Sequence, residues 1–163
     1  MQVNQPKEGG TKATTAAPVT HIAAKRQRAE HVNEVMRIIA SHGRRFFYSA
    51  TSNRYASIEV DARGRVWFID DYSGKAIYTH PTGFTNRWRG FTHGGTLRSL
   101  VEAFRDYITN GVPLSPAYLG PERHRLTDGN IWGYDDNSMR AVRELAGAFP
   151  VFTQPVSGEV HHA

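Results

Sequence analysis

The stretch that decides the fold is residues 55–79, YASIEVDARGRVWFIDDYSGKAIYT. It contains three short strand-like runs, at 55–60, 65–69 and 75–79, and a turn-forming sequence with a glycine follows each of the first two. In residues 55–60 apolar and more polar side chains alternate, which is typical of a strand with one buried face. Because tight turns connect antiparallel neighbours, these runs predict three adjacent antiparallel strands.

A fourth strand is predicted immediately upstream, at residues 45–49. A short polar segment separates it from the next run, as expected of a hairpin. The four strands would then form an antiparallel meander, in which each strand pairs with the next along the chain. Since the run at 65–69 carries large apolar residues on both sides, we expect at least one face of this sheet to be covered.

Helices are expected to provide that cover. The spacing of apolar residues predicts an N-terminal helix over 26–42, ended by Gly43, a second helix over 96–110, capped by Thr96, and a third over 137–149. The apolar stripes that support these helices are Val32, Val35, Met36 and Ile39 in the first, Leu97, Leu100, Val101, Phe104 and Ile108 in the second, and Met139, Val142, Leu145, Ala146 and Phe149 in the third.

Together these elements predict an α+β fold: an N-terminal helix, a four-stranded antiparallel β-meander and two C-terminal helices packed mainly on one sheet face. The chain has 163 residues, of which 39% are hydrophobic, and this is enough for one domain with a buried core. We expect that domain at residues 25–152. Residues 1–24 and 153–163 contain few large apolar side chains, so both are predicted to be disordered tails.

Composition also limits the cellular compartments in which we expect the protein. No apolar run approaches the roughly 20 residues that span a bilayer, and the first residues lack the charged head and apolar segment of a secretory signal. The chain has no cysteine, which excludes disulfides and thiolate metal sites. We therefore expect a soluble protein in a reducing, cytoplasmic setting, without a membrane partner.

Basic and aromatic residues occur together in three places. The net charge of +5 indicates an anionic partner. Interleaved arginines and aromatic rings can contact phosphates and stack on bases, or they can anchor a protein interface. Alternatively, Phe46, Tyr48, Trp88 and Phe91 belong to the core and the arginines to its solvated rim. The predicted partner-binding residues are Arg44, Arg45, Arg87, Trp88, Arg89, Arg123 and Arg125.

A possible anion site lies at the start of the second predicted helix, at Gly94, Gly95 and Thr96. Free backbone N–H groups and the positive end of the helix dipole can hold a phosphate or carboxylate there. A double glycine before a capping residue also turns a chain into a helix without any ligand.

A polar group near the predicted strand ends consists of Asp70, Asp71, His80 and His93. Such residues can bind a divalent metal or share acid–base work. Adjacent strand residues point to opposite faces, however, so Asp71 is better explained as the residue that opens a turn and accepts its backbone hydrogen bonds. The chain contains no Gly-x-Ser-x-Gly or His-Glu-x-x-His motif. We therefore predict no catalytic residues, no metal and no cofactor.

Several short motifs carry a resemblance. They are GRRFF at 43–47, DARGRVWFID at 61–70, YSGK at 72–75 with YTH at 78–80, and WRGF at 88–91 with HGGTL at 93–97. Through them the segment from about residue 31 to 149 resembles uncharacterised small accessory proteins of proteobacterial phages, prophages and mobile elements. The resemblance implies that the protein binds a host protein or complex, including a defence system, or binds DNA directly. It transfers no catalytic residue.

We therefore expect a non-enzymatic phage or mobile-element protein that binds a bacterial host protein or complex and inhibits a defence or nucleic-acid-handling system. The alternative is direct DNA or RNA binding by the outer sheet face and the segment that follows it. A third possibility is a metal-dependent enzyme that uses Asp70, Asp71, His80 and His93.

Overall fold

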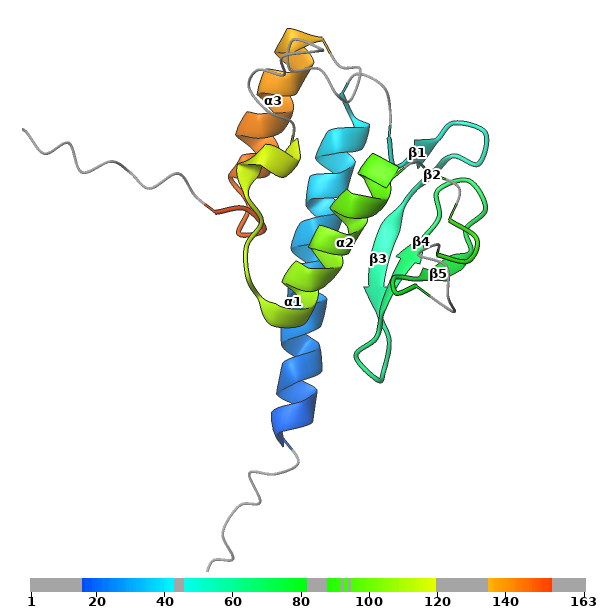
Figure 1. The fold of residues 1–163 in the computed structure, drawn as a ribbon, viewed down its shortest axis with the longest axis vertical. Coiled ribbons are helices and arrows are strands. Elements are labelled where there is room, and N and C mark those ends of the chain that lie inside the picture. Colours follow the sequence, from blue (N-terminus) through cyan, green and yellow to red (C-terminus); the bar gives the residue numbers. More distant parts are fainter. Residues whose placement is uncertain are drawn as a thin grey trace, which may run out of the picture.

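The computed structural model describes residues 16–42, 46–81, 88–91, 93, 95–119 and 135–153. The fold class is α+β, as predicted (Figure 1). In chain order the elements are α1 (Ala16–Ala40), β1 (Tyr48–Ser49), β2 (Arg54–Tyr55), β3 (Ser57–Val60), β4 (Val66–Ile69), β5 (Ala76–Tyr78), α2 (Gly95–Asn110), the short 3-10 helix η1 (Pro116–Leu119) and α3 (Asp136–Gly147).

The strands form two antiparallel sheets where one meander was expected. β1 pairs only with β2, and the second sheet has the order β3-β4-β5. The predicted strand at 55–60 is interrupted at Ala56, whose N–H donates to the carbonyl of Phe47 at 2.8 Å. Phe47 has a φ of +65°, which is not a strand conformation, so among the described residues of the predicted strand at 45–49 only Tyr48 and Ser49 are in a strand. This leaves a two-residue pairing between Tyr48–Ser49 and Arg54–Tyr55.

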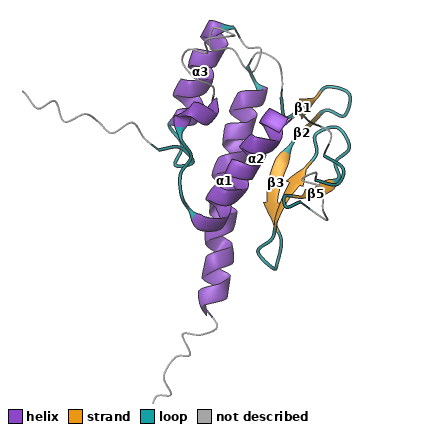
Figure 2. Cartoon of the chain, in the orientation of Figure 1, coloured by secondary structure: helices purple, strands orange, loops and turns teal. Residues whose placement is uncertain are grey.

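The helices lie on one side of the strands (Figure 2). α1 packs against β3 and α2 packs against β4, whereas α3 packs on α1 and η1. The sheet is therefore covered by α1 and α2, and α3 belongs to an outer layer. α1 can contact both layers because its buried residues, which include Val32, Val35, Met36 and Ile39, occupy a wide arc of the helix.

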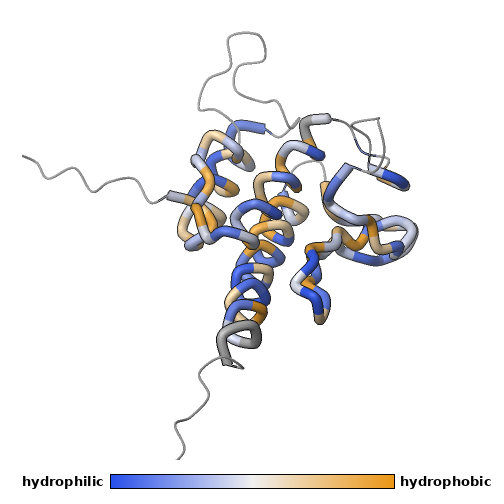
Figure 3. The backbone as a smooth tube through the Cα atoms, turned by 60° about the horizontal axis from the view of Figure 1, so that its bottom comes forward, coloured by the Kyte–Doolittle hydropathy of each residue, from blue (hydrophilic) through white to orange (hydrophobic). Residues whose placement is uncertain are grey.

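The predicted alternation of buried and exposed residues is confirmed in the three-stranded sheet. Ile58, Val60, Val66 and Phe68 are buried beneath the helices, while Glu59 and the residues that alternate with them in β4 are more exposed. Hydrophobic residues also recur along the helices, interspersed with hydrophilic ones (Figure 3). The core therefore lies between the sheet, α1 and α2.

α1 begins at Ala16, well before the predicted start at 26, so residues 16–24 are helical and were wrongly assigned to the disordered tail. This segment is rich in alanine, the strongest helix former. It is also held by tertiary contacts: Ile22 packs on the core, and the Lys25 ammonium donates to the carbonyl of Gly64 at 3.0 Å. The helix ends at Ala40.

The other helix boundaries agree more closely with the sequence. α2 begins at Gly95, so Thr96, the predicted cap, lies within the helix. α3 is capped by Asp135, whose side chain accepts from the N–H of Ser138 at 2.7 Å. Leu145 was predicted to face the core but is 50% exposed. Each residue turns an α-helix by about 100°, so Leu145 lies about 60° around the helix from Val142, which is buried.

The predicted cap Gly43 and residues 154–163 of the predicted C-terminal tail lie outside the described residues. Across the part of the chain that the structure describes, no helix is both long and apolar enough to span a membrane.

Candidate functional site

The turn after β4 places two neighbouring carboxylates beside the core. One oxygen of Asp70, Oδ2, accepts hydrogen bonds from the backbone N–H and from the hydroxyl of Ser73, both at 2.8 Å. The chain reverses at Gly74, whose φ of +69° favours glycine, and the N–H of Gly74 donates to the Asp70 carbonyl at 2.9 Å. The sequence assigned the turn-opening role to Asp71. That interpretation was wrong, because the turn begins one residue earlier, at Asp70.

Asp70, Asp71 and His93 form a compact polar cluster. His93 Nε2 lies 3.4 Å from Asp70 Oδ1 and 3.3 Å from Asp71 Oδ1. Asp71 follows the strand and does not continue it, so its side chain reaches the same side as that of Asp70. His80, the fourth member of the predicted group, is not part of this cluster and contacts Tyr78 in a tilted arrangement, with ring centroids 5.1 Å apart.

The cluster is buried and its charges are coupled. The two aspartates are 4% and 6% exposed. The close approach of the Asp71 carboxylate, together with that of Asp70, raises the pKa of His93 against the opposing effect of burial. Burial opposes ionisation of Asp70, but the hydrogen bonds from Ser73 and the charge of His93 hold the pKa of its carboxyl below the usual value. For His80, by contrast, burial and the nearby charge of Arg105 lower the pKa.

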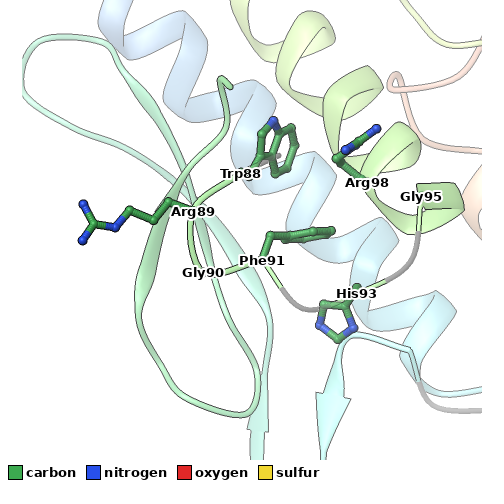
Figure 4. A pocket seen from close by; sticks show the side chains of 7 residues that line it. All are labelled: Trp88, Arg89, Gly90, Phe91, His93, Gly95 and Arg98. Carbon is green, nitrogen blue, oxygen red and sulfur yellow. The ribbon is translucent and has the colours of Figure 1, made fainter. Parts of the chain in front are cut away.

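His93 also lines a cleft of about 520 Å³ between the segment 88–91 and the start of α2. The side chains of Trp88, Phe91 and His93 approach it from one side, and Arg98 and Gly95 approach it from α2 (Figure 4). The rings of Trp88 and Phe91 pack edge to face at 5.1 Å between centroids. The cleft therefore combines aromatic walls, a guanidinium group and the amino end of a helix.

Two of the predicted partner-binding residues are described. Trp88 is 3% exposed and packs in the core, in agreement with the alternative reading of the aromatic residues. Arg89 is exposed and points away from the other side chains around the cleft (Figure 4). The remaining predicted residues, Arg44, Arg45, Arg87, Arg123 and Arg125, lie outside the described residues. Their part in partner binding thus stays a prediction.

One residue of the predicted anion site, Gly95, lies on the same cleft. Gly95 begins α2 and lines the cleft. Gly94 and the side chain of Thr96 lie outside the description. Sequence reasoning did not single out Arg98, because one arginine in the first turns of a helix matches no motif. Its position two residues after Thr96 could have indicated that Arg98 lies near the predicted anion site.

The outer face of the three-stranded sheet carries a row of aromatic rings that contact one another at tilted angles. Trp67 and Tyr78 occupy opposite positions on β4 and β5, with centroids 5.0 Å apart, and His80 extends the row. The guanidinium of Arg65 lies 5.5 Å from the Trp67 ring centre. The Trp67 indole N–H donates to Asp61 at 3.0 Å, and this bond, together with those from Arg65, holds the pKa of Asp61 well below its usual value.

Comparison with known proteins agrees with the prophage part of the predicted resemblance. The family model named YoqU matches residues 23–152. A protein of Bacillus subtilis strain 168, described as the SPbeta prophage-derived uncharacterized protein YoqU, is 33% identical over 121 residues, which cover 74% of this chain and 79% of that protein. No solved structure matches the chain. Bacillus is not a proteobacterium, so the proteobacterial part of the resemblance is not supported. The chain belongs to the YoqU family, which includes a prophage-derived protein.

Proposed function

We propose that this protein is a non-enzymatic binding protein of a mobile element, which docks onto a bacterial host protein or complex and inhibits a defence or nucleic-acid-handling system. The observation that carries the proposal is the cleft between residues 88–91 and α2, where Arg98 and the amino end of a helix lie beside aromatic side chains. The prophage origin of its relative supports a partner inside a bacterial host.

The chemistry of the cleft favours an anionic group on the partner. A guanidinium forms paired hydrogen bonds with a carboxylate or phosphate, and the dipole of α2 favours negative charge near Gly95. Arginine and aromatic side chains are also the residues that most often dominate binding energy at interfaces. The net charge of +5 adds long-range attraction toward an acidic surface. An acidic segment of a host protein would match all of these features. Binding would block that segment without any chemical reaction.

A pull-down with mass spectrometry tests this proposal. The purified protein serves as bait in a nuclease-treated host lysate, alongside the variants Arg98→Ala and Arg140→Ala. Arg140 is exposed on α3 and does not line the cleft, so it provides a matched loss of charge. We expect one defined host complex with the wild type and with Arg140→Ala, and at least about tenfold weaker binding with Arg98→Ala. Equal capture by Arg98→Ala would exclude the cleft, and capture of nothing would exclude the function.

The second candidate is direct binding of single-stranded nucleic acid, and the row of aromatic rings on the outer sheet face favours it. Bases stack on exposed aromatic rings, and Arg65 beside Trp67 supplies a positive charge. The ionised carboxylate of Asp61, which lies beside these rings, would repel a phosphate and weaken such binding. Binding to a single-stranded oligonucleotide should weaken steeply with salt and be reduced in Tyr78→Ala. If no complex forms at low salt, this candidate is excluded.

A further inference from the structure

We propose that Asp70, Asp71 and His93 bind one divalent transition-metal ion of the Zn²⁺ or Mn²⁺ type. Each residue offers one donor atom, and the three atoms lie within 4.8 Å of one another. The inference is independent of the docking function proposed above, because it rests on the interior of the cluster and not on a partner.

The spacing of the donor atoms fits a shared ion better than it fits hydrogen bonds. His93 Nε2 lies 3.4 Å from Asp70 Oδ1 and 3.3 Å from Asp71 Oδ1. A hydrogen bond between nitrogen and oxygen is about 2.9 Å long. Ligands about 2.0–2.2 Å from a tetrahedral ion are separated by about 3.3–3.6 Å. Both observed separations fall in that interval.

The donor atoms also lack other partners. Among the described residues, Asp70 Oδ1, Asp71 Oδ1 and His93 Nε2 are buried without a hydrogen bond. The two aspartates are 4% and 6% exposed, so two carboxylates are withdrawn from water side by side. Burying such charges without compensation is costly, and a single imidazole nitrogen can direct its one N–H at only one of them. A dication compensates both carboxylates and accepts the nitrogen lone pair as well.

The surroundings hold the donors in place. Asp70 uses its other oxygen to accept two hydrogen bonds from Ser73, which fixes the direction of Oδ1. The His93 ring lies against Phe91 and Phe68, with centroids 5.4 and 6.4 Å away. Carboxylate and imidazole donors suit Zn²⁺ and Mn²⁺ and do not suit ions that prefer sulfur.

The site has a route to solvent. His93 lines the cleft, and its side chain is 28% exposed. Three protein ligands leave at least one coordination position, which a water molecule can occupy. An ion can therefore enter from the cleft after folding.

Calorimetric titration with Zn²⁺, repeated with Mn²⁺, tests the proposal on full-length protein freed of metal by chelation. His161 and His162 are adjacent in the sequence and could themselves bind Zn²⁺, so the double variant His161→Ala/His162→Ala is titrated alongside. We expect one ion per chain in both proteins. Asp71→Asn and His93→Gln should each weaken binding at least about 100-fold, whereas the matched controls Asp106→Asn and His80→Gln should not change it.

Melting curves provide a second readout. At a hundredfold excess over Kd, the metal should raise the Tm of the wild type by about 5–10 °C and leave that of Asp71→Asn unchanged. The Asp71 substitution preserves side-chain volume, and Asp70, not Asp71, holds the turn, so Asp71→Asn should keep the wild-type circular dichroism spectrum. If that variant failed to fold, His93→Gln would decide. The proposal is overturned if neither ion binds the wild type, if binding disappears in the His161/His162 double variant, or if Asp71→Asn binds like the wild type.

Discussion

Asn33 is a polar residue of α1 that binds the backbone of β3, at the edge of the three-stranded sheet. Its side-chain amide donates to the carbonyl of Ile58 at 3.1 Å, and its side-chain oxygen accepts from the Ile58 N–H at 2.7 Å. β3 is an edge strand, so these two bonds replace those that a further strand would make. Replacement of Asn33 by Ala would therefore leave both backbone groups of Ile58 without their partner.

The expected cost follows from the burial of Ile58, which is 1% exposed. Each unsatisfied buried backbone group costs about 1–2 kcal/mol where some water can reach it. The better helix propensity of alanine returns about 0.6 kcal/mol. Asn33→Ala should thus lower the free energy of unfolding by about 1.5–3.5 kcal/mol.

Urea unfolding followed by circular dichroism measures this change at equilibrium. Gln27→Ala is the matched control, because Gln27 is an exposed amide on the same helix and should change the free energy of unfolding by less than about 0.5 kcal/mol. If Asn33→Ala cost no more than Gln27→Ala, the conclusion that Asn33 joins α1 to β3 energetically would be refuted.

Three further predictions concern local structure. Gly74→Ala should destabilise the protein by about 1–2 kcal/mol in urea unfolding, because Gly74 has a φ of +69° and a methyl group there would collide with the Arg54 guanidinium. The control Gly147→Ala places its methyl group in open space and should be neutral or stabilising. Asp135→Ala should lower the Tm by a few degrees at neutral pH because it removes the cap of α3. The hydrogen bonds from Ser138 lower the pKa of Asp135. The stability that the Asp135 carboxylate provides is therefore complete above its ordinary pKa near 4 and is lost as the pH falls through the lower pKa of the folded state. The Tm values of variant and wild type should converge in acid, and a Tm difference that stays constant with pH would contradict this. Leu145→Lys should change the free energy of unfolding by less than about 0.5 kcal/mol, whereas Val142→Lys, at 1% exposure, should prevent folding; similar effects would place Leu145 in the core after all.

Local patterns in the sequence were sufficient for most of the secondary structure. The alternation in residues 55–60 and the glycines at 64 and 74 predicted the strands and turns of the three-stranded sheet. The apolar stripe of α2 predicted that helix to within one residue of its start. These signals work because helix and strand periodicity is set by the side chains of neighbouring residues.

The sequence was less informative where distant segments decide the conformation. The strands divide into two sheets at Ala56, whose N–H donates to the carbonyl of Phe47, and the contact of Lys25 with the Gly64 carbonyl helps to keep the start of α1 in place. Neither follows from local propensity. For the same reason α3 was expected on the sheet, although α1 occupies that face.

The sequence by itself determined the α+β class, the order of the elements and the residues from which a polar site could be built. Only the tertiary structure decided which of those residues meet: it joined Asp70 and Asp71 to His93 and left His80 on the outer sheet face. The physical reason is that a side chain's direction depends on the turn that carries it. The residues that it meets from distant segments depend on how α2 packs against β4, and no local sequence pattern encodes that packing.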